Sequence, residues 1–424
     1  MDGFNLALPD TLFHVLIWII AIVLVLIAGF LFAAVYRRIA QARRYRRLDR
    51  LRVECAAGIR EAIDRGAAAE IPRKFAFRPN SPGWTAVEDV LFALCDEPGY
   101  GSRAASFFPL LGYVAHYERA LRKRNVIDRS LAIDKLGRMK SAASLDMLVS
   151  LLSVRSSEIV TNAVRALARI GSLAGLEGIL TRMDDLLANG MISRKTLETS
   201  LLNFGSAAVP LFVKAAEAGH ESVSRGSLLE VLGRLSAKEG VPVAMRLLGD
   251  PNPEIRSMSL KLIGTSGIEL TDGPREAVAS LLDDPAWFVR LQAAKTLGSA
   301  GDPELAGRLG DRLMDSNWQV RNAAATALTR FGNPAIPVFL ATLEHTDRYA
   351  KESVCEEIEK SGFVDLLVAN LGDRESGVYE SSKRILAVMA ALNYRTPHVE
   401  CLKTPLPEQV RRDIETMIAQ EARA

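Results

Sequence analysis

The sequence predicts an all-α protein, an α-solenoid of helical hairpins preceded by a single transmembrane helix. Three observations lead to this fold class. An uncharged apolar segment stands near the N-terminus, and a short residue pattern recurs along most of the remaining chain. The composition, rich in Ala, Leu and Arg and with only 6% aromatic residues, favours helices.

The chain has 424 residues, 49% of them hydrophobic and 24% charged, which is enough for two or three ordinary domains or one extended array. Its four cysteines lie far apart and form no CxxC pair, so neither a zinc site nor a disulfide framework is indicated. They are Cys55, Cys95, Cys355 and Cys401. A reducing compartment is the simplest interpretation.

The apolar segment FHVLIWIIAIVLVLIAGFLFAAVY, residues 13–36, has no charged residue and as a helix would cross a hydrocarbon layer of about 30 Å. A cleaved signal peptide is the alternative. However, two acids and no Lys or Arg precede the segment, no small-residue cleavage site follows it, and it exceeds the roughly 7–15 residues of a signal core. We therefore predict a membrane anchor.

An arginine-rich segment, RRIAQARRYRRLDRLR, follows the anchor and contains eight arginines and one aspartate. Positive charge next to a span stays in the cytoplasm, which predicts that residues 1–12 lie outside and everything after the span inside. The net charge of this segment is +7, whereas that of the whole chain is +3, so the remaining residues together carry −4. Because the rest of the chain is not basic, no nucleic-acid partner is expected. The arginines fix topology and are placed to contact anionic lipid head groups, chiefly Arg37, Arg38, Arg43, Arg44, Arg46 and Arg47.

The remaining chain is predicted to have four further parts. A basic juxtamembrane helix covers residues 37–66, and a linker with three prolines covers residues 67–83. Capping helices follow at 84–125, then the repeats at 126–392. Residues 393–424 are predicted to form a linker and an amphipathic helix.

The repeat is clearest where DDPAWFVRLQAAKTLGSAGDPE, from Asp283, is followed by MDSNWQVRNAAATALTRFGNPA, from Met314. Three residues after the Arg of this pattern the residue is small or apolar, and seven residues after it stands a large aliphatic. These two positions share one helix face, so each unit contains a helix with a buried stripe. The nine equivalent register residues are Arg129, Val160, Arg194, Arg225, Arg256, Arg290, Arg321, Lys351 and Tyr379.

A second helix completes each unit. Pro303 and Pro334 stand near the starts of such helices, where the missing N–H of proline is harmless. Sharp turns between the two helices are marked by acids and helix breakers, as in GDPNPE, DDPAW and DSNW. Two short helices cannot bury their apolar faces alone, whereas stacked pairs can, which predicts a solenoid.

The pattern D-P-x-x-x-V-R-x-x-A-A-x-x-L-G-x-x-G-D-P, from Asp284 to Pro303, resembles the short bacterial HEAT repeat, a type also found in phycobilisome-lyase-like proteins. The resemblance covers roughly nine units. It weakens at Val160 and after Lys351. Neither the tetratricopeptide nor the ankyrin pattern is present. Together with the anchor, the resemblance implies a single-pass protein of the bacterial inner membrane with its solenoid in the cytoplasm.

The resemblance also implies a structural ladder, in which register arginines bridge the carbonyls and acids of neighbouring turns. Its predicted members are Arg129, Arg194, Arg225, Arg256, Arg290 and Arg321. Phosphate binding by these arginines is the alternative, but regular recurrence in successive units favours a structural role.

Trp287 and Trp318 each stand three residues before a register arginine, where most other units have smaller residues. Two large aromatics on adjacent turns would form a ridge at one edge of the solenoid. Because Trp is enriched in binding hot spots, the two residues are candidate partner-binding residues. The simpler alternative is that each Trp packs under the turn of its neighbour.

Enzyme signatures are missing from the sequence. There is no GxxxxGK[ST], HExxH or GxSxG, and GYGSRA at Gly99 has no strand before it. A hydroxylase resembling deoxyhypusine hydroxylase would need several His-Glu pairs, and this chain has only His220-Glu221. We predict no catalytic residue, no cofactor and no metal site.

The predicted function is therefore that of a scaffold or adaptor without catalysis. The solenoid is expected to bind a partner protein and the anchor to hold it at a membrane or envelope-synthesis complex. A lyase-like or metal-dependent modifying enzyme of the HEAT type is the alternative.

Overall fold

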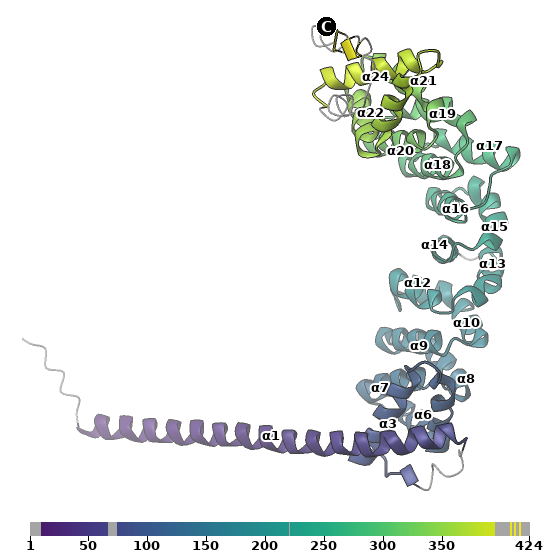
Figure 1. Ribbon diagram of the computed structural model, residues 1–424. Helices are drawn as coiled ribbons and strands as arrows, with labels where there is room; N and C mark the ends of the chain where they lie inside the picture. The colour runs from purple at the N-terminus through teal and green to yellow at the C-terminus, as the bar shows by residue number, and fades with distance from the viewer. Residues whose placement is uncertain are drawn as a thin grey trace, which may run out of the picture. The chain divides into compact units, whose positions relative to one another are not determined.

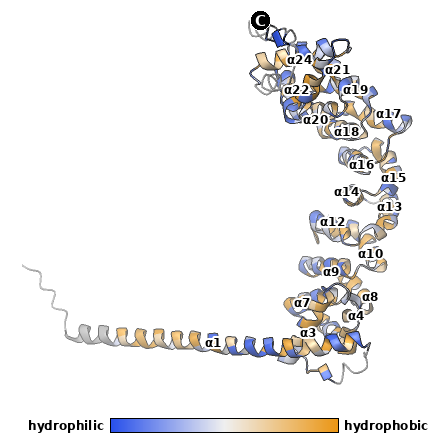
Figure 2. Cartoon of the chain, in the orientation of Figure 1, coloured by the Kyte–Doolittle hydropathy of each residue, from blue (hydrophilic) through white to orange (hydrophobic). Residues whose placement is uncertain are grey.

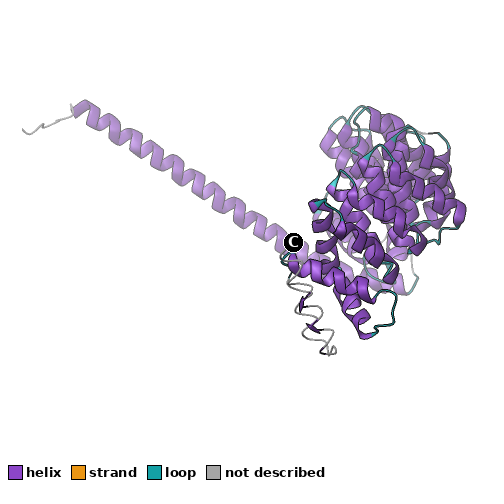
Figure 3. Cartoon of the chain, turned by 90° about the horizontal axis from the view of Figure 1, so that it is seen from above, coloured by secondary structure: helices purple, strands orange, loops and turns teal. Residues whose placement is uncertain are grey.

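The computed structural model describes residues 10–66, 74–219 and 221–394, together with positions 408, 411, 412, 415 and 416. All regular secondary structure in these residues is helical, and the repeats form a solenoid (Figures 1 and 3). The predicted fold class, an all-α solenoid, is thereby confirmed. The chain divides into two compact units, residues 1–148 and 149–424.

Unit 1 begins with α1 (Asp10–Asp64), a single helix of 55 residues. An 18-residue window within it has a mean hydropathy of 3.0, and none of that window is buried. Figure 2 shows this apolar stretch in orange, followed by a blue stretch that contains the arginines. By length and composition α1 is able to cross a membrane, although an N-terminal signal sequence passes the same test. The predicted segments 13–36 and 37–66 thus belong to one continuous helix, which ends at Asp64, two residues before the predicted end.

The C-terminal part of α1 packs against α3 (Pro82–Cys95). Cys55, Ile59 and Ile63 are buried along this part of α1. Two arginines of α1 form ion pairs with acids of unit 1: Arg52 with Asp89 at 2.6 Å and Arg60 with Glu97 at 2.5 Å.

Part of the predicted linker, residues 67–83, packs on this surface. Phe75 is buried against Gly58 of α1, where an added Cβ would lie 2.8 Å from the ring. The side chain of Ser81 caps α3 by accepting a hydrogen bond from the N–H of Trp84, so this helix begins within the predicted linker. Residues 67–73 lie outside the described residues.

The other helices of unit 1 pack around an aromatic core. Tyr113 donates a hydrogen bond from its Oη to the carbonyl of Trp84 at 2.7 Å, and the two ring centroids are 3.8 Å apart. The helices are α4 (Gly101–Ala105), α5 (Phe107–Leu110), α6 (Tyr113–Leu121) and α7 (Val126–Arg138); η1 (Ala142–Ser144) and the first residues of α8 (Leu145–Ser150) follow.

A buried carboxylate joins three of these helices. Glu88 of α3 accepts hydrogen bonds from the Oη of Tyr117 at 2.7 Å and from the Nζ of Lys135 at 2.9 Å. Its side chain is only 5% exposed. Lys135 lies in α7, which belongs to unit 1, because the division between the two compact units falls at Leu148.

Loss of the cation at Lys135 should destabilise unit 1. In the Lys135→Met variant the Glu88 carboxylate would stay buried without its cation, which typically costs about 3–5 kcal/mol. The measurement is hydrogen–deuterium exchange of peptides from α3 and α6 in the full-length chain, where the variant should exchange faster.

The matched control for this measurement is Lys123→Met. Lys123 pairs with Asp128 at 3.2 Å, but both side chains are well exposed, so its loss should cost about 0–1 kcal/mol. Equal exchange in the two variants would show that the Glu88–Lys135 pair does not hold unit 1 together.

Unit 2 consists of two layers of helices (Figure 1). The first layer contains the register residues, and consecutive helices of it pack side by side over most of its length. Its members are α9 (Ser157–Ile170), α12 (Arg194–Leu202), α14 (Ser222–Arg234), α16 (Pro253–Thr265), α18 (Trp287–Ala300), α20 (Trp318–Thr329), α22 (Arg348–Lys360) and α24 (Tyr379–Ala391). The second layer comprises α10 (Leu173–Leu180), α11 (Met183–Ala188), α13 (Val209–Glu217), α15 (Val241–Arg246), α17 (Asp272–Ser280), α19 (Ala306–Asp311), α21 (Ile336–Glu344) and α23 (Phe363–Ala369).

The predicted buried stripe is present in all nine sequence repeats, the first of which lies in unit 1. The residues seven positions after the register residue are at most 2% exposed: Leu136, Leu167, Leu201, Leu232, Ile263, Leu297, Leu328, Ile358 and Leu386. The residues three positions after it are fully buried. Close packing also requires Gly298, because a Cβ there would lie 2.6 Å from the Cβ of Ala327 in α20. The stripe is therefore buried between the helices, and the lack of a side chain at Gly298 allows α18 and α20 to approach closely.

Two second-layer helices begin near the predicted prolines, but through a turn of 3-10 helix. Pro303 starts η7 (Pro303–Leu305) before α19, and Pro334 lies in η9 (Asn333–Ala335) before α21. The carboxylate of Asp302 accepts a hydrogen bond from the N–H of Glu304 at 3.0 Å, which caps this start.

Candidate functional site

Arginines and aspartates join successive turns of unit 2. Arg256 donates from Nε and Nη2 to both carboxylate oxygens of Asp284, at 2.7 and 2.8 Å, and from Nη1 to the carbonyl of Asp250 at 2.8 Å. Arg290 repeats this geometry one unit later, with Asp315 at 2.7 and 2.8 Å and the carbonyl of Asp284 at 2.9 Å. Each guanidinium thus closes its own turn and binds the next one.

The aspartates of this ladder are almost buried. The side chains of Asp284 and Asp315 are 3% and 4% exposed, and each also accepts an N–H from its own turn. Burial opposes the charge of Asp315, but the hydrogen bonds from Arg290 and from the N–H of Asn317, with nearby positive charge, lower its pKa below the usual value. The same hydrogen bond raises the pKa of Arg290.

The ladder is shorter than the sequence predicts. Arg225 makes a single contact with Asp250 at 3.2 Å, and Arg321 reaches only the carbonyl of Asp315 at 2.8 Å. Arg194 pairs with Glu198 of its own helix, and Arg129 lies in unit 1, with its Nε buried without a partner among the described residues.

The reason for this difference is visible in the sequence. Each bridging aspartate stands six residues before the register residue of its own unit, as Asp250, Asp284 and Asp315 do. In the unit after Arg194 the equivalent residue is Gly219, and in the unit after Arg321 it is His345. Without a carboxylate in the following turn, the register arginine has no partner there.

Removal of one ladder arginine should destabilise unit 2. The Arg290→Met variant leaves the Asp315 carboxylate buried without its cation, and we expect the free energy of unfolding to fall by about 3–5 kcal/mol at neutral pH. Urea unfolding of the full-length chain in detergent, followed by circular dichroism, measures this. Arg308→Met is the control, because its pair with Glu276 is exposed and should contribute about 0–1 kcal/mol.

The pH dependence separates charge from packing. The pKa of Asp315 is lower in the folded chain than in the unfolded chain, so its stabilisation is complete above the unfolded value of about 4 and is lost as pH falls through the folded value. The difference between the wild type and Arg290→Met should therefore shrink in acid. A difference that does not change with pH would mean that Arg290 acts only by packing.

Beside the ladder lie three exposed aromatic side chains, Trp287, Trp318 and Tyr349, which we call the aromatic row. Trp287 and Trp318 are the first residues of α18 and α20, and 40% and 60% of each residue is exposed. Tyr349, near the start of α22, is 68% exposed. Its ring centroid is 5.9 Å from the guanidinium of Arg321.

This exposure favours the interaction hypothesis over packing. A Trp covered by its neighbour's turn would be largely buried, as Trp84 is at 5%. The sequence pattern did not indicate Tyr349, because it stands two residues before its register residue, whereas the two tryptophans stand three residues before theirs. A search for aromatic residues two or three positions before the register residue in adjacent repeats would have found all three.

The predicted lipid-facing arginines lie on α1. Arg37, Arg38, Arg43, Arg46 and Arg47 are all exposed, whereas Arg52 is held by the acids of unit 1. The side chain of Arg44 lies outside the described residues. Lipid binding stays a prediction.

No group of three His, Cys, Asp or Glu side chains within the described ranges is arranged to hold a metal ion. His220 and Cys401 lie outside those ranges. Cys355 is fully buried, and this burial raises the pKa of its thiol to about 12, so the thiolate is scarcely populated at neutral pH.

The stacked hairpins and their linked turns define a helical-repeat solenoid protein. Residues 274–359 match a family model described as HEAT repeats, which confirms the resemblance for this part of the chain. This match spans α17 to α22, where the Arg290–Asp315 bridge and the aromatic row lie. No curated protein matches the sequence.

Several solved structures are similar at low identity. An engineered protein is 18% identical, with 84% of this chain and 99% of that chain covered and a TM-score of 0.34. Kap121p bound to Nup53p is 12% identical, with coverages of 81% and 46% and a TM-score of 0.43, so this chain spans less than half of Kap121p. Human deoxyhypusine hydroxylase with glycerol is 19% identical, with coverages of 66% and 99% and a TM-score of 0.26.

Proposed function

We propose that this protein is a membrane-anchored scaffold whose cytoplasmic HEAT-repeat solenoid binds a partner protein without catalysing a reaction. The observation that carries the proposal is the aromatic row on a rigid repeat framework. Exposed Trp and Tyr side chains offer large apolar contact area with little side-chain entropy to lose on binding. The stripe and the ladder hold the helices that present them.

Recruitment is the proposed mechanism. The apolar part of α1 anchors the chain in the bacterial inner membrane, and the exposed arginines keep the following residues in the cytoplasm. A partner bound to the solenoid is then concentrated near a membrane enzyme, transporter or envelope-polysaccharide synthase. The uncharged span and the arginine cluster support the anchor, and the repeat architecture supports a protein partner.

The proposed topology is tested with reporters fused after Ala424. A reporter that is active only outside the cytoplasm should stay silent, and one that fluoresces only in the cytoplasm should be active, because the arginines retain their side of the span. The matched control removes the positive charge. When the exposed arginines of α1 are changed to Gln, the preference for this orientation should weaken. An active external reporter on the wild-type chain would contradict the proposed orientation.

The aromatic row is tested by Trp287→Ala and Trp318→Ala, made singly and together because neighbouring units are coupled. If the row binds a partner, the double variant should lose about 2 kcal/mol or more of binding, roughly thirtyfold in affinity. Partial exposure limits the expected loss of folding stability to about 1–2 kcal/mol, below the 3–5 kcal/mol typical of buried aromatics.

The measurement has two parts. Affinity capture from detergent-solubilised membranes with mass spectrometry identifies proteins retained by the wild type, and unfolding of each variant is measured in parallel. Leu173→Ala is the control, since Leu173 is 45% exposed at the start of α10 in the other layer. Large destabilisation of the double variant, with binding lost only as folded protein disappears, would identify the tryptophans as packing residues.

A further inference from the structure

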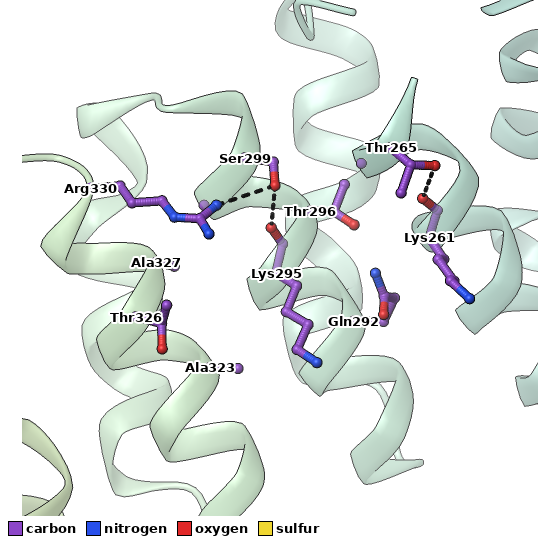
Figure 4. A pocket seen from close by; sticks show the side chains of 12 residues that line it. Lys261, Thr265, Gln292, Lys295, Thr296, Ser299, Ala323, Thr326, Ala327 and Arg330 are labelled. Carbon is purple, nitrogen blue, oxygen red and sulfur yellow. Dashed lines mark hydrogen bonds between the residues drawn. The ribbon is translucent and has the colours of Figure 1, made fainter. Parts of the chain in front are cut away.

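A second feature of the same repeats is a pocket on α16, α18 and α20, with a volume of about 390 Å³ (Figure 4). This size suits one or two side chains of a ligand. Lys261, Lys295 and Arg330 line it, one from each helix or its C-terminal cap. No acidic residue is among its lining residues.

The cations of the pocket differ in how they are compensated. Lys261 is held by Glu230 of α14, with Nζ 2.7 and 2.9 Å from the two carboxylate oxygens. Lys295 is exposed and has no ion pair among the described residues, and Arg330 makes only a long contact of 3.4 Å with the hydroxyl of Ser299. By contrast, Arg256, Arg275, Arg290, Arg308 and Arg312 are all ion-paired. The pocket therefore carries two uncompensated positive charges.

The hydroxyls of the pocket indicate what kind of anion fits. The Oγ1 of Thr265 donates to the carbonyl of Lys261 at 2.9 Å, and that of Thr326 donates to the carbonyl of Asn322 at 2.8 Å. Ser299 donates likewise to the carbonyl of Lys295 at 3.1 Å. Because these hydroxyl protons are committed to the backbone, the oxygens are left to accept hydrogen bonds from a ligand.

This combination matches an acidic peptide better than a free inorganic anion. Carboxylate side chains would pair with Lys295 and Arg330, while backbone N–H groups of the same segment would donate to the hydroxyl oxygens. Phosphate at neutral pH offers mainly acceptors and would leave those oxygens unused. We propose that the pocket binds an acidic segment of the partner protein, so that this inference rests on the proposed function and names the partner's chemistry.

The pocket floor is rigid. Gly264 and Gly298 line the pocket, and an added Cβ would lie 3.0 Å from the Oγ1 of Thr296 or 2.6 Å from the Cβ of Ala327. The helices therefore approach closely and hold the cations on a fixed surface. These glycines are unsuitable for testing because their substitution would disturb the packing.

The test uses the full-length protein in detergent and a fluorescein-labelled hexaglutamate peptide, with the hexaglutamine peptide as the neutral probe. Fluorescence anisotropy gives the dissociation constant. We expect the double variant Lys295→Gln/Arg330→Gln to weaken hexaglutamate binding about tenfold, because two charge-assisted contacts are lost. The arginines of α1 also attract the peptide, but every variant retains them.

The matched control is Arg165→Gln/Arg234→Gln, which should change the affinity less than about twofold. Arg165 follows its register residue by five positions, as Lys295 does, and Arg234 follows by nine, as Arg330 does. Both are exposed and lie outside the pocket. The two double variants remove the same charge from the same helix positions, so only location distinguishes them.

A second readout locates the bound peptide. Hexaglutamate should slow the acylation of Lys295 by an amine-reactive reagent, as measured by mass spectrometry. Equal affinities in the two double variants, or no protection of Lys295, would overturn the proposal. Protection by inorganic phosphate or by vesicles of anionic phospholipid, but not by hexaglutamate, would also overturn it and assign a different ligand.

Failure of this inference is distinguishable from failure of the proposed function. If partner capture depends on the aromatic row but hexaglutamate does not bind at the pocket, the proposed scaffold function stands and only the proposal of an acidic partner segment is rejected. Trp287→Ala should not alter hexaglutamate binding, because Trp287 is not among the residues that line the pocket.

Discussion

No hairpin of unit 2 can bury its own apolar stripe, and this constraint governs the rest of the structure. The eight aliphatic stripe residues of unit 2 are covered largely because helices of successive repeats pack side by side. Burial of each such residue contributes roughly 1.5–3 kcal/mol, so stability in such an array comes mainly from interfaces between neighbours. Close approach at Gly298 shows how little freedom remains along these interfaces.

Two faces of α16 and of α18 are therefore committed, one to the stripe and one to the turn ladder. Residues outside these faces are able to vary without disturbing the stack. In α18, Trp287 stands at the first residue and Lys295 two turns later, and both are exposed. The aromatic row and the pocket share α18 and α20, where the row stands at the first residue and the pocket is lined by residues farther along each helix. A repeat framework is thereby able to present more than one contact to a single partner.

The sequence predicts what is periodic and local. The register residues placed the buried stripe in every unit, because spacings of three and seven residues select one helix face. The ladder was only partly predictable, since each bridge needs an aspartate in the following unit as well as the arginine. The pocket was not predicted, because its lining residues come from three helices and have meaning only after stacking.

At the boundary between the two units, too, a contact between residues far apart in the sequence was not predictable from the repeat pattern. Glu88 and Lys135 are 47 residues apart in the sequence, and nothing in the periodicity connects them. Arg129 lies in a helix with the repeat pattern, yet the carboxylate of Glu88 ties that helix to α3. The buried ion pair between Glu88 and Lys135 is thus one contact, besides the packing of α6 on α7, that joins the first helix with the repeat pattern to unit 1.

The end of the ladder shows how the fold and the aromatic row are connected. Arg290 finds a bidentate carboxylate in the next unit, whereas Arg321 faces the ring of Tyr349 because His345 occupies the aspartate position. An exposed cation–π contact contributes about 0.5–1 kcal/mol, less than a nearly buried bidentate pair whose breaking costs several. The turns of α20 and α22 are consequently joined more weakly than those of α18 and α20. The aromatic row therefore ends where the ionic ladder stops. A ligand that covers Trp318 and Tyr349 would strengthen the weaker of these two junctions.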